Sequence, residues 1–330
     1  MVKWSSGRVK KLPTPSCFLP ALRLVACGLW FAAGSAQAAE LYAKKMEIVR
    51  TPDGQVTLFR DSVRISDGET RISAGWARVS ESRSLAVIGD SVLIRNPDAV
   101  INADSCVYRM DQKRTRLFGN VRVVQESLVV TAPRLEYVVN ERKVYADSGL
   151  VVQGRSRDFR LEGERGSYDL GQDMGIVDRS PRMVRSQGDD SVTVLADEMR
   201  WTANASEALA AGNVSVRSGS AGMTCDSLRY FANADSGLAW GSPVVTDSVS
   251  RTTGDTVAMR VEDGNLDLVT ISGSAQSTYR TEGGELIEVA GKLIVVDIDE
   301  GEVGTIEVRE LSYGRLVRSA GEEIKGETGG

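Results

Sequence analysis

Hydrophobic and polar residues alternate with a period of two along most of this chain, and the alternation is clearest from Gly119 to Tyr137. In a first run, Val121 and Val123 flank Arg122, and residues 128–132 form a second run of the same kind. Alternation carried by β-branched residues is typical of half-buried β-strands. The pattern therefore predicts two paired strands joined by a short polar turn.

The same pattern occurs nine times, and a small residue, which we term the anchor, marks each repeat. Successive anchors are 29 to 36 residues apart. An aliphatic residue or methionine stands two positions before the anchor in the first seven repeats, and mostly apolar columns follow three and five positions after it. Internal repeats of this kind predict a stack of similar units. The anchors are Ala43, Ala74, Ala103, Ala132, Gly163, Ala196, Cys225, Gly254 and Ala290.

The spacing of the columns predicts the shape of each unit. Side chains two residues apart share one face of a strand, so the three-residue step after the anchor breaks the parity. A bulge or corner at the small anchor restores it, and each strand then begins in one sheet and ends in a second. The predicted fold is all-β: an elongated, twisted β-jellyroll, or solenoid-like stack of antiparallel strands in two facing sheets. Two bent strands per repeat give about 18 rungs, which at roughly 4.8 Å per rung span on the order of 85 Å.

The chain divides into three parts. Residues 1–38 have a basic start, an apolar core and the small-residue site Ala36-Gln37-Ala38, which together are typical of a secretory signal peptide. Leu24-Val25-Ala26-Cys27 also fits a bacterial lipobox, which would leave a lipid on Cys27; both alternatives predict export. Residues 39–315 are expected to form one repeated domain, and the Gly/Glu-rich residues 316–330 a disordered tail.

Composition argues against several classes of function. The chain has no histidine, which removes the commonest general base and metal ligand. Loss of the five basic residues of the leader takes the net charge from −5 to about −10, which is unfavourable for binding nucleic acid. We expect no enzymatic activity, no catalytic residue, no metal and no cofactor. Cys106 and Cys225 lie four repeats apart, or about eight rungs and roughly 38 Å, too far for a disulfide.

The apolar columns allow two interpretations. They form either a packed core or an interior slot that accepts an acyl chain, in which each buried methylene contributes about 0.8 kcal/mol. Sparse aromatic residues and small anchors favour the slot. The candidate lipid-lining residues are Ile72, Ile101, Val130, Leu161, Val194, Met223, Val92, Val121 and Val214.

Two segments carry a family resemblance. Gly119–Tyr137 reads G-N-V-x-V … V-x-A-x-x-L-x-Y, and the pattern returns from Gly212 to Tyr230 with Met223 and Cys225 replacing the valine and alanine. It resembles the OstA-like superfamily, which includes LptA-type periplasmic lipopolysaccharide-transport proteins and the periplasmic domain of LptD-type assembly proteins. The resemblance covers about residues 41–300. It implies a V-shaped β-jellyroll that shields lipid A acyl chains and stacks end to end between the two membranes.

The resemblance implies a periplasmic bridge or carrier in the transport of lipopolysaccharide to the outer membrane. Its expected partners are lipopolysaccharide or a similar acylated lipid, other lipopolysaccharide-transport proteins bound through edge strands, and further copies of the chain in head-to-tail contact. Nucleic acid is not an expected partner. The alternative is a purely structural β-solenoid, a surface or filament protein with a dry core.

Overall fold

The computed structural model describes residues 40–317, except for short gaps at 53, 68, 81, 98, 110, 126–127, 139, 155–158, 170, 173, 188–189, 203–206, 232–233, 263–264, 282–283 and 300–301. The predicted signal segment with Cys27, and residues 318–330 of the predicted tail, lie outside the described residues. The first two residues of that tail, Leu316 and Val317, belong to the last strand of the structure. The described part is all-β, and its 25 strands belong to one antiparallel hydrogen-bonded network.

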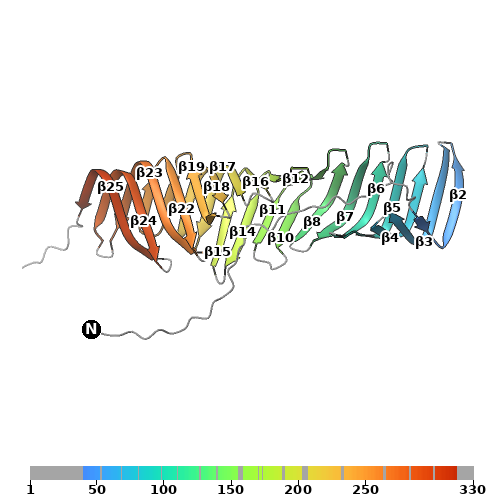
Figure 1. The fold of residues 1–330 in the computed structure, drawn as a ribbon, viewed down its shortest axis with the longest axis horizontal. Helices are drawn as coiled ribbons and strands as arrows, with labels where there is room; N and C mark the ends of the chain where they lie inside the picture. Colours follow the sequence, from blue (N-terminus) through green and yellow to red (C-terminus); the bar gives the residue numbers. More distant parts are fainter. Residues whose placement is uncertain are drawn as a thin grey trace, which may run out of the picture.

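The strands stack as rungs along an elongated body, with β2 at one end and β25 at the other (Figure 1). Eleven rungs are single strands: β3 (Gly54–Asp67), β4 (Thr70–Ser80), β5 (Leu85–Arg95), β6 (Val100–Arg109), β7 (Arg114–Val124), β8 (Leu128–Val138), β17 (Glu207–Ser218), β18 (Ala221–Phe231), β23 (Asn265–Arg280), β24 (Leu286–Asp299) and β25 (Glu302–Val317).

Seven further rungs are each divided into two strands. They are β1 (Glu40–Tyr42) with β2 (Lys45–Thr51), β9 (Lys143–Ala146) with β10 (Leu150–Gly154), β11 (Phe159–Gly163) with β12 (Arg165–Asp169), β13 (Met174–Asp178) with β14 (Arg182–Gln187), β15 (Asp190–Leu195) with β16 (Glu198–Thr202), β19 (Ser236–Trp240) with β20 (Val244–Thr246), and β21 (Ser250–Thr253) with β22 (Thr256–Glu262). The 25 described strands therefore make 18 rungs, which confirms the predicted number.

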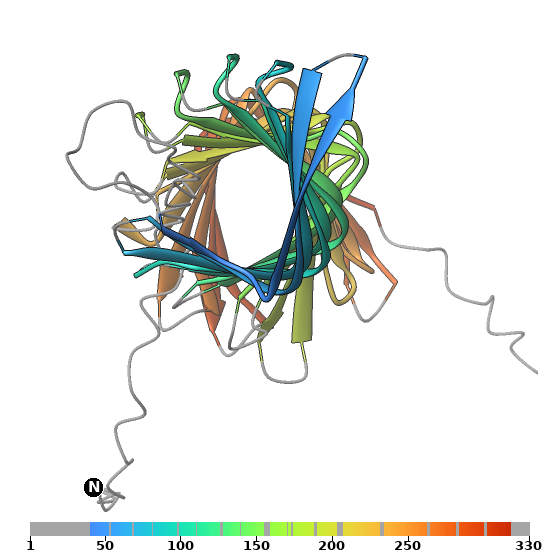
Figure 2. The ribbon, with the colours of Figure 1, turned by 90° about the vertical axis from the view of Figure 1, so that its right-hand side faces the viewer.

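Each rung bends at a corner, so the stack has two layers. We call the layer that contains β10, β11, β14 and β15 the first layer, and the layer that contains β9, β12, β13 and β16 the second layer. Seen along the long axis, successive rungs rotate relative to one another, as the handed twist of β-strands requires (Figure 2). The predicted arrangement, in which each strand turns a corner from one layer into the other, is confirmed.

At the β7–β8 corner, a two-residue bulge lies in the strand that faces the anchor strand. Between β7 and β8, Val121 pairs with Ala132 and Phe118 with Arg134, so two residues of β7 oppose one residue of β8. These two, Gly119 and Asn120, have φ angles of 72° and 46°, in the left-handed region. The predicted corner at the anchor is confirmed: the strands of three anchor rungs are interrupted at or next to Gly163, Ala196 and Gly254. The bulge itself lies in the facing strand, because glycine and asparagine enter the left-handed region at low cost, whereas alanine does not.

The final repeat differs from the predicted register by one residue. Ala275, which is fully buried, pairs with Gly291, and Ile271 pairs with Ile294. The anchor of this repeat is therefore Gly291, and the predicted Ala290 lies on the outer face opposite Gln276. The pairing of β23 with β24 sets this register, while the two-residue bulge between Ser272 and Ala275 is like the one in β7.

Candidate functional site: the interior between the two layers

The first layer carries an unbroken apolar row on its inner face. Paired strands place one side chain per rung directly opposite the next, so the row can be followed from register alone. Thirteen successive pairings, beginning at the β1–β3 pair, join 14 apolar residues. We call this the apolar row: Leu41, Ile65, Ile72, Ile94, Ile101, Val123, Val130, Val152, Leu161, Met183, Val194, Val216, Met223 and Val245.

All nine candidate lining residues are buried in the interior. Six of them belong to the apolar row: Ile72, Ile101, Val130, Leu161, Val194 and Met223. The other three lie beside it at the corner, where each pairs with the anchor of the next rung: Val92 with Ala103, Val121 with Ala132 and Val214 with Cys225. The register therefore brings all nine together along one face. Their contact with lipid stays a prediction.

The second layer carries a different row, in which large and small side chains alternate. Trp201 leans over Gly175 of the neighbouring rung, since a Cβ atom on Gly175 would lie 2.0 Å from Cζ2 of Trp201. A short residue on one rung thus makes room for the aromatic ring of its neighbour. We call this the aromatic row: Ala86, Tyr108, Thr115, Tyr137, Val144, Tyr168, Gly175, Trp201, Ala208, Tyr230, Gly237 and Met259.

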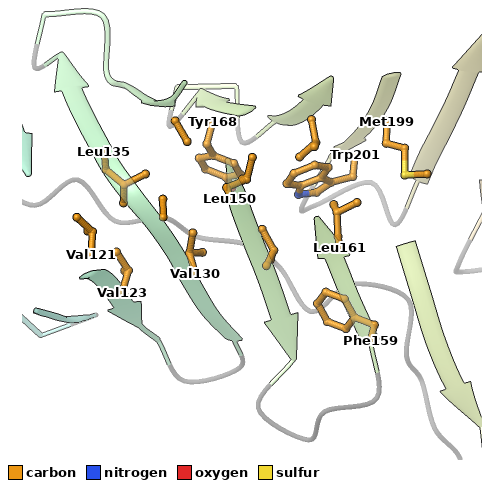
Figure 3. Packing of buried hydrophobic residues seen from close by; sticks show 14 of the residues in the cluster. Val121, Val123, Val130, Leu135, Leu150, Phe159, Leu161, Tyr168, Met199 and Trp201 are labelled. Atoms are coloured by element: carbon orange, nitrogen blue, oxygen red, sulfur yellow. The ribbon is translucent and has the colours of Figure 1, made fainter. Parts of the chain in front are cut away.

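The interior is closely packed near the middle of the stack. Figure 3 shows Leu150, Leu161, Tyr168 and Trp201 in this region. A void of about 30 Å³ remains there, lined by Leu150, Tyr168, Trp201 and other mostly apolar side chains. That volume suits a single small group and is much smaller than an acyl chain. The sequence pattern predicts a slot from the scarcity of aromatic residues, but the aromatic row fills much of this space.

Two polar residues interrupt the apolar row beyond Val245. The apolar row continues from Val245 into Thr252 and then Ser277. Both are buried, and their hydroxyl oxygens lie 2.9 Å apart in a hydrogen bond. Because the two hydroxyls satisfy each other, this polar step can be buried at low cost.

Charged side chains pair across rungs on the outer faces. Nε of Arg134 donates to Asp147 at 3.0 Å, and Nε of Arg165 donates to Asp178 at 2.8 Å. The guanidinium groups hold the pKa of each of these carboxyls below its usual range. Such exposed pairs contribute little to stability, and they keep the outer faces soluble.

A groove of about 920 Å³ follows the corner between β7 and β14. It is lined by corner residues and by Arg122, Thr131, Glu162 and Arg182. Those four pair in one line across the outer face of the first layer, with Val151 between Thr131 and Glu162. The groove is therefore lined by charged and polar side chains together with apolar ones.

Both ends of the stack leave apolar side chains uncovered. Met46 and Ile48 of β2 are 62% and 53% exposed, and they continue the inner face of the second layer through their pairing with Phe59 and Thr57. At the other end, Leu311 and Leu316 of β25 are 60% and 52% exposed. Within the described residues, β2 and β25 each pair on one side only. The ends are thus exposed edge strands with apolar side chains, which favour pairing with another edge.

Both cysteines of the described chain are buried, and neither forms a disulfide. They lie on β6 and β18, which are eight rungs apart, as the repeats predict. Burial raises the pKa of the Cys225 thiol to about 11.

We therefore expect native protein at pH 8 to resist iodoacetamide at both Cys106 and Cys225, since the thiolate is the reactive form. At Cys225 the rate should be about a hundredfold below that of the unfolded chain. Mass spectrometry of labelled peptides with and without denaturant measures this. Rapid native labelling, or a peptide that links the two cysteines, would contradict the structure.

The sequence contains a further feature of the corners, which the columns of the repeat do not include. An aspartate directly follows the anchor in several repeats, and a Gly-Asn or Gly-Ser pair follows 15 or 18 residues later. In the structure these meet: Nδ2 of Asn120 donates to Asp104 at 3.1 Å, and Nδ2 of Asn213 donates to Asp197 at 2.8 Å. The side chain thus closes each corner across two rungs.

Among the described residues, no group of three or more His, Cys, Asp and Glu side chains is arranged to hold a metal ion. In the same part of the chain, no helix has the length and hydropathy needed to cross a membrane.

No protein-family model matches the chain, and no curated protein matches it. Among solved structures 17 chains match, one of them the crystal structure of LptH, described as the LptA-homologous periplasmic component of the lipopolysaccharide transport device of Pseudomonas aeruginosa. It is 16% identical, covers 31% of this chain and 76% of LptH, and has a TM-score of 0.27.

Proposed function

We propose that this protein is a periplasmic carrier or bridge that holds the acyl chains of lipopolysaccharide, or of a similar lipid, between its two layers and passes them along the stack. The observation that carries the proposal is the apolar row, which runs without a polar interruption from Leu41 to Val245. A continuous apolar surface binds acyl chains in any longitudinal position, since each methylene contributes about 0.8 kcal/mol wherever it lies. Movement along the stack then meets no polar barrier over most of its length.

Binding requires the two layers to separate. The backbone pairings of the described strands join residues on the same side of the corner. The backbone therefore connects the two layers only at the corners. Separation would therefore break side-chain contacts between layers and leave the ladder hydrogen bonds intact. From β9 to β16 each rung is divided at the corner, which makes the middle of the stack the favoured hinge.

Photo-crosslinking tests the proposal with a matched set of sites. Ile101, Val130 and Leu161 belong to the apolar row, while the next residues, Asn102, Thr131 and Glu162, lie on the outer face. We expect a crosslinking amino acid at each inner site to capture lipopolysaccharide in cells, and each outer neighbour to capture at least about tenfold less. Equal capture at both sets would indicate adsorption to the surface, and no capture at either would end the proposal.

A structural β-solenoid is the second candidate, and the small interior void favours it. A dry core would be filled by its own side chains, as the aromatic row fills the middle of this stack. Uptake of a fluorescent acyl-chain probe by delipidated protein distinguishes the two, because a solenoid whose layers stay closed would not take up the probe. Mass spectrometry of lipid that co-purifies with the protein would identify the cargo.

The exposed ends lead us to propose head-to-tail assembly, either between copies or with other lipopolysaccharide-transport proteins. We expect the double substitution Met46→Lys and Ile48→Lys to weaken self-association at least about tenfold, since it places two charges on an apolar edge. Sedimentation over a range of concentrations measures this, with Glu47→Lys as the control on the opposite face of β2. A strict monomer at high concentration would count against assembly between copies.

A further inference from the structure

The indole of Trp201 brings a hydrogen-bond donor into the apolar interior. Trp201 is 4% exposed, and its Nε1 has no hydrogen-bond partner among the described residues. The ring projects into the interior next to Tyr168 and Leu150 (Figure 3). A buried donor left unpaired costs about 1–3 kcal/mol, so a folded protein keeps one where something else supplies the acceptor.

The surroundings of this donor form a shaped site. Trp201 lines the void of about 30 Å³ together with Leu135, Leu150 and Ile176. Two glycines shape the site: a Cβ on Gly175 would meet the indole at 2.0 Å, and a Cβ on Gly166 would meet Cδ1 of Leu150 at 2.9 Å. The void has room for one small polar group beside the indole, while the walls around it are mostly apolar.

A second unpaired polar atom lies on the same row. Oγ1 of Thr115 is buried without a hydrogen-bond partner in the described chain, and Thr115 is 2% exposed. It precedes Trp201 by five rungs, roughly 24 Å. Both atoms face the interior from the second layer, whereas the apolar row opposite them carries no polar side chain between Leu41 and Val245.

We propose that Trp201 donates a hydrogen bond to an oxygen borne by an acyl chain, an ester carbonyl or a chain hydroxyl, and so makes the middle of the stack selective for oxygen-bearing acyl lipids over plain hydrocarbon chains. This rests on the proposed function, since the lipid must already lie between the layers. The two sources of the oxygen share one chemistry: an acceptor within reach of an N–H group, on an otherwise apolar chain. The site orients the lipid, while the apolar row supplies most of the affinity.

Two matched pairs of probes test the selectivity with full-length protein. The first pair is a dioctanoyl glycerophospholipid with ester linkages and its dioctyl ether analogue, and the second is 3-hydroxytetradecanoate and tetradecanoate. We expect wild-type protein to bind the better acceptor of at least one pair several-fold to about tenfold more tightly. Trp201→Phe should remove this preference. Trp240→Phe, which changes an indole that stacks under Arg229 away from the void, should keep it.

Nuclear magnetic resonance gives a second readout that does not need a variant to bind lipid. In protein labelled with ¹⁵N-tryptophan, the Trp201 indole proton should shift downfield with the preferred probe and not with its partner. If wild-type protein binds both members of each pair equally, or Trp201→Phe keeps the preference, Trp201 faces a buried water only and the selectivity is refuted while the proposed carrier function stands. If none of the four probes binds, both fall.

Discussion

Replacement of Val130 by aspartate is expected to lower the free energy of unfolding by about 3–5 kcal/mol, because it places an unpaired charge in the centre of the apolar row. Val130 is 3% exposed and pairs with Val123 and Val152. The same replacement at Thr131, which faces outward opposite Arg122, should change stability by less than about 0.5 kcal/mol. Chemical denaturation of the two variants measures the difference.

The pH dependence of the Val130→Asp variant identifies the cause. Burial raises the pKa of a carboxyl in the folded state above its unfolded value of about 3.9. The penalty should therefore be largest at neutral pH and should shrink as the pH falls toward 4, where the folded protein holds the proton. A penalty that is constant between pH 7 and pH 4 would indicate a steric cause, and a larger penalty at Thr131 than at Val130 would show that the strand register is wrong.

Replacement of Gly119 by alanine is expected to cost about 2–5 kcal/mol, through two separable effects. The first is backbone strain, because Gly119 has a φ angle of 72°. The second is a clash, because the new Cβ would lie 2.0 Å from Oδ2 of Asp104. Gly149 provides the matched control: its φ angle is 92°, and no atom lies within 4 Å of a new Cβ.

Gly149→Ala should therefore show the strain alone, about 1–2 kcal/mol. A double-mutant cycle of Gly119→Ala with Asp104→Ala should be clearly non-additive, since removal of the aspartate carboxyl relieves the clash. Urea denaturation midpoints of the four proteins supply the numbers. Equal losses at Gly119 and Gly149, or strict additivity in the cycle, would mean that the aspartate moves aside and that the corner is not closed by this contact.

Much of the fold could be predicted because the repeat pattern occurs nine times in the sequence. Alternation at Val121 and Val123 assigns the inner face of one strand, and its recurrence at Val214 assigns another in the same way. The three-residue step after each anchor requires a corner, so two layers and 18 rungs follow from spacing alone. The nine candidate lining residues fall inside because parity determines which face a side chain occupies.

The site itself was less predictable, because its features depend on pairs of rungs. The aromatic row needs short residues, such as Gly175 and Ala208, because they pair with the large side chain of Trp201 on the neighbouring rung. The unpaired nitrogen of Trp201 is a property of everything around it. The register of the last repeat depends on the pairing of β23 with β24, which places Gly291 instead of Ala290 on the inner face.

The sequence by itself determined the strand type, the repeat and the inward face of each rung, because these depend on local geometry and on the burial of every second side chain. Only the tertiary structure decided which strand at each corner carries the bulge, how far the interior is filled and which polar atoms inside it lack a partner. At the β7–β8 corner the bulge lies at Gly119 and Asn120 because conformational cost is lowest there, and the carboxyl of Asp104 on the neighbouring rung closes it. Packing between the layers brings together residues that are distant in sequence. The periodicity of the sequence does not predict which of these residues come into contact.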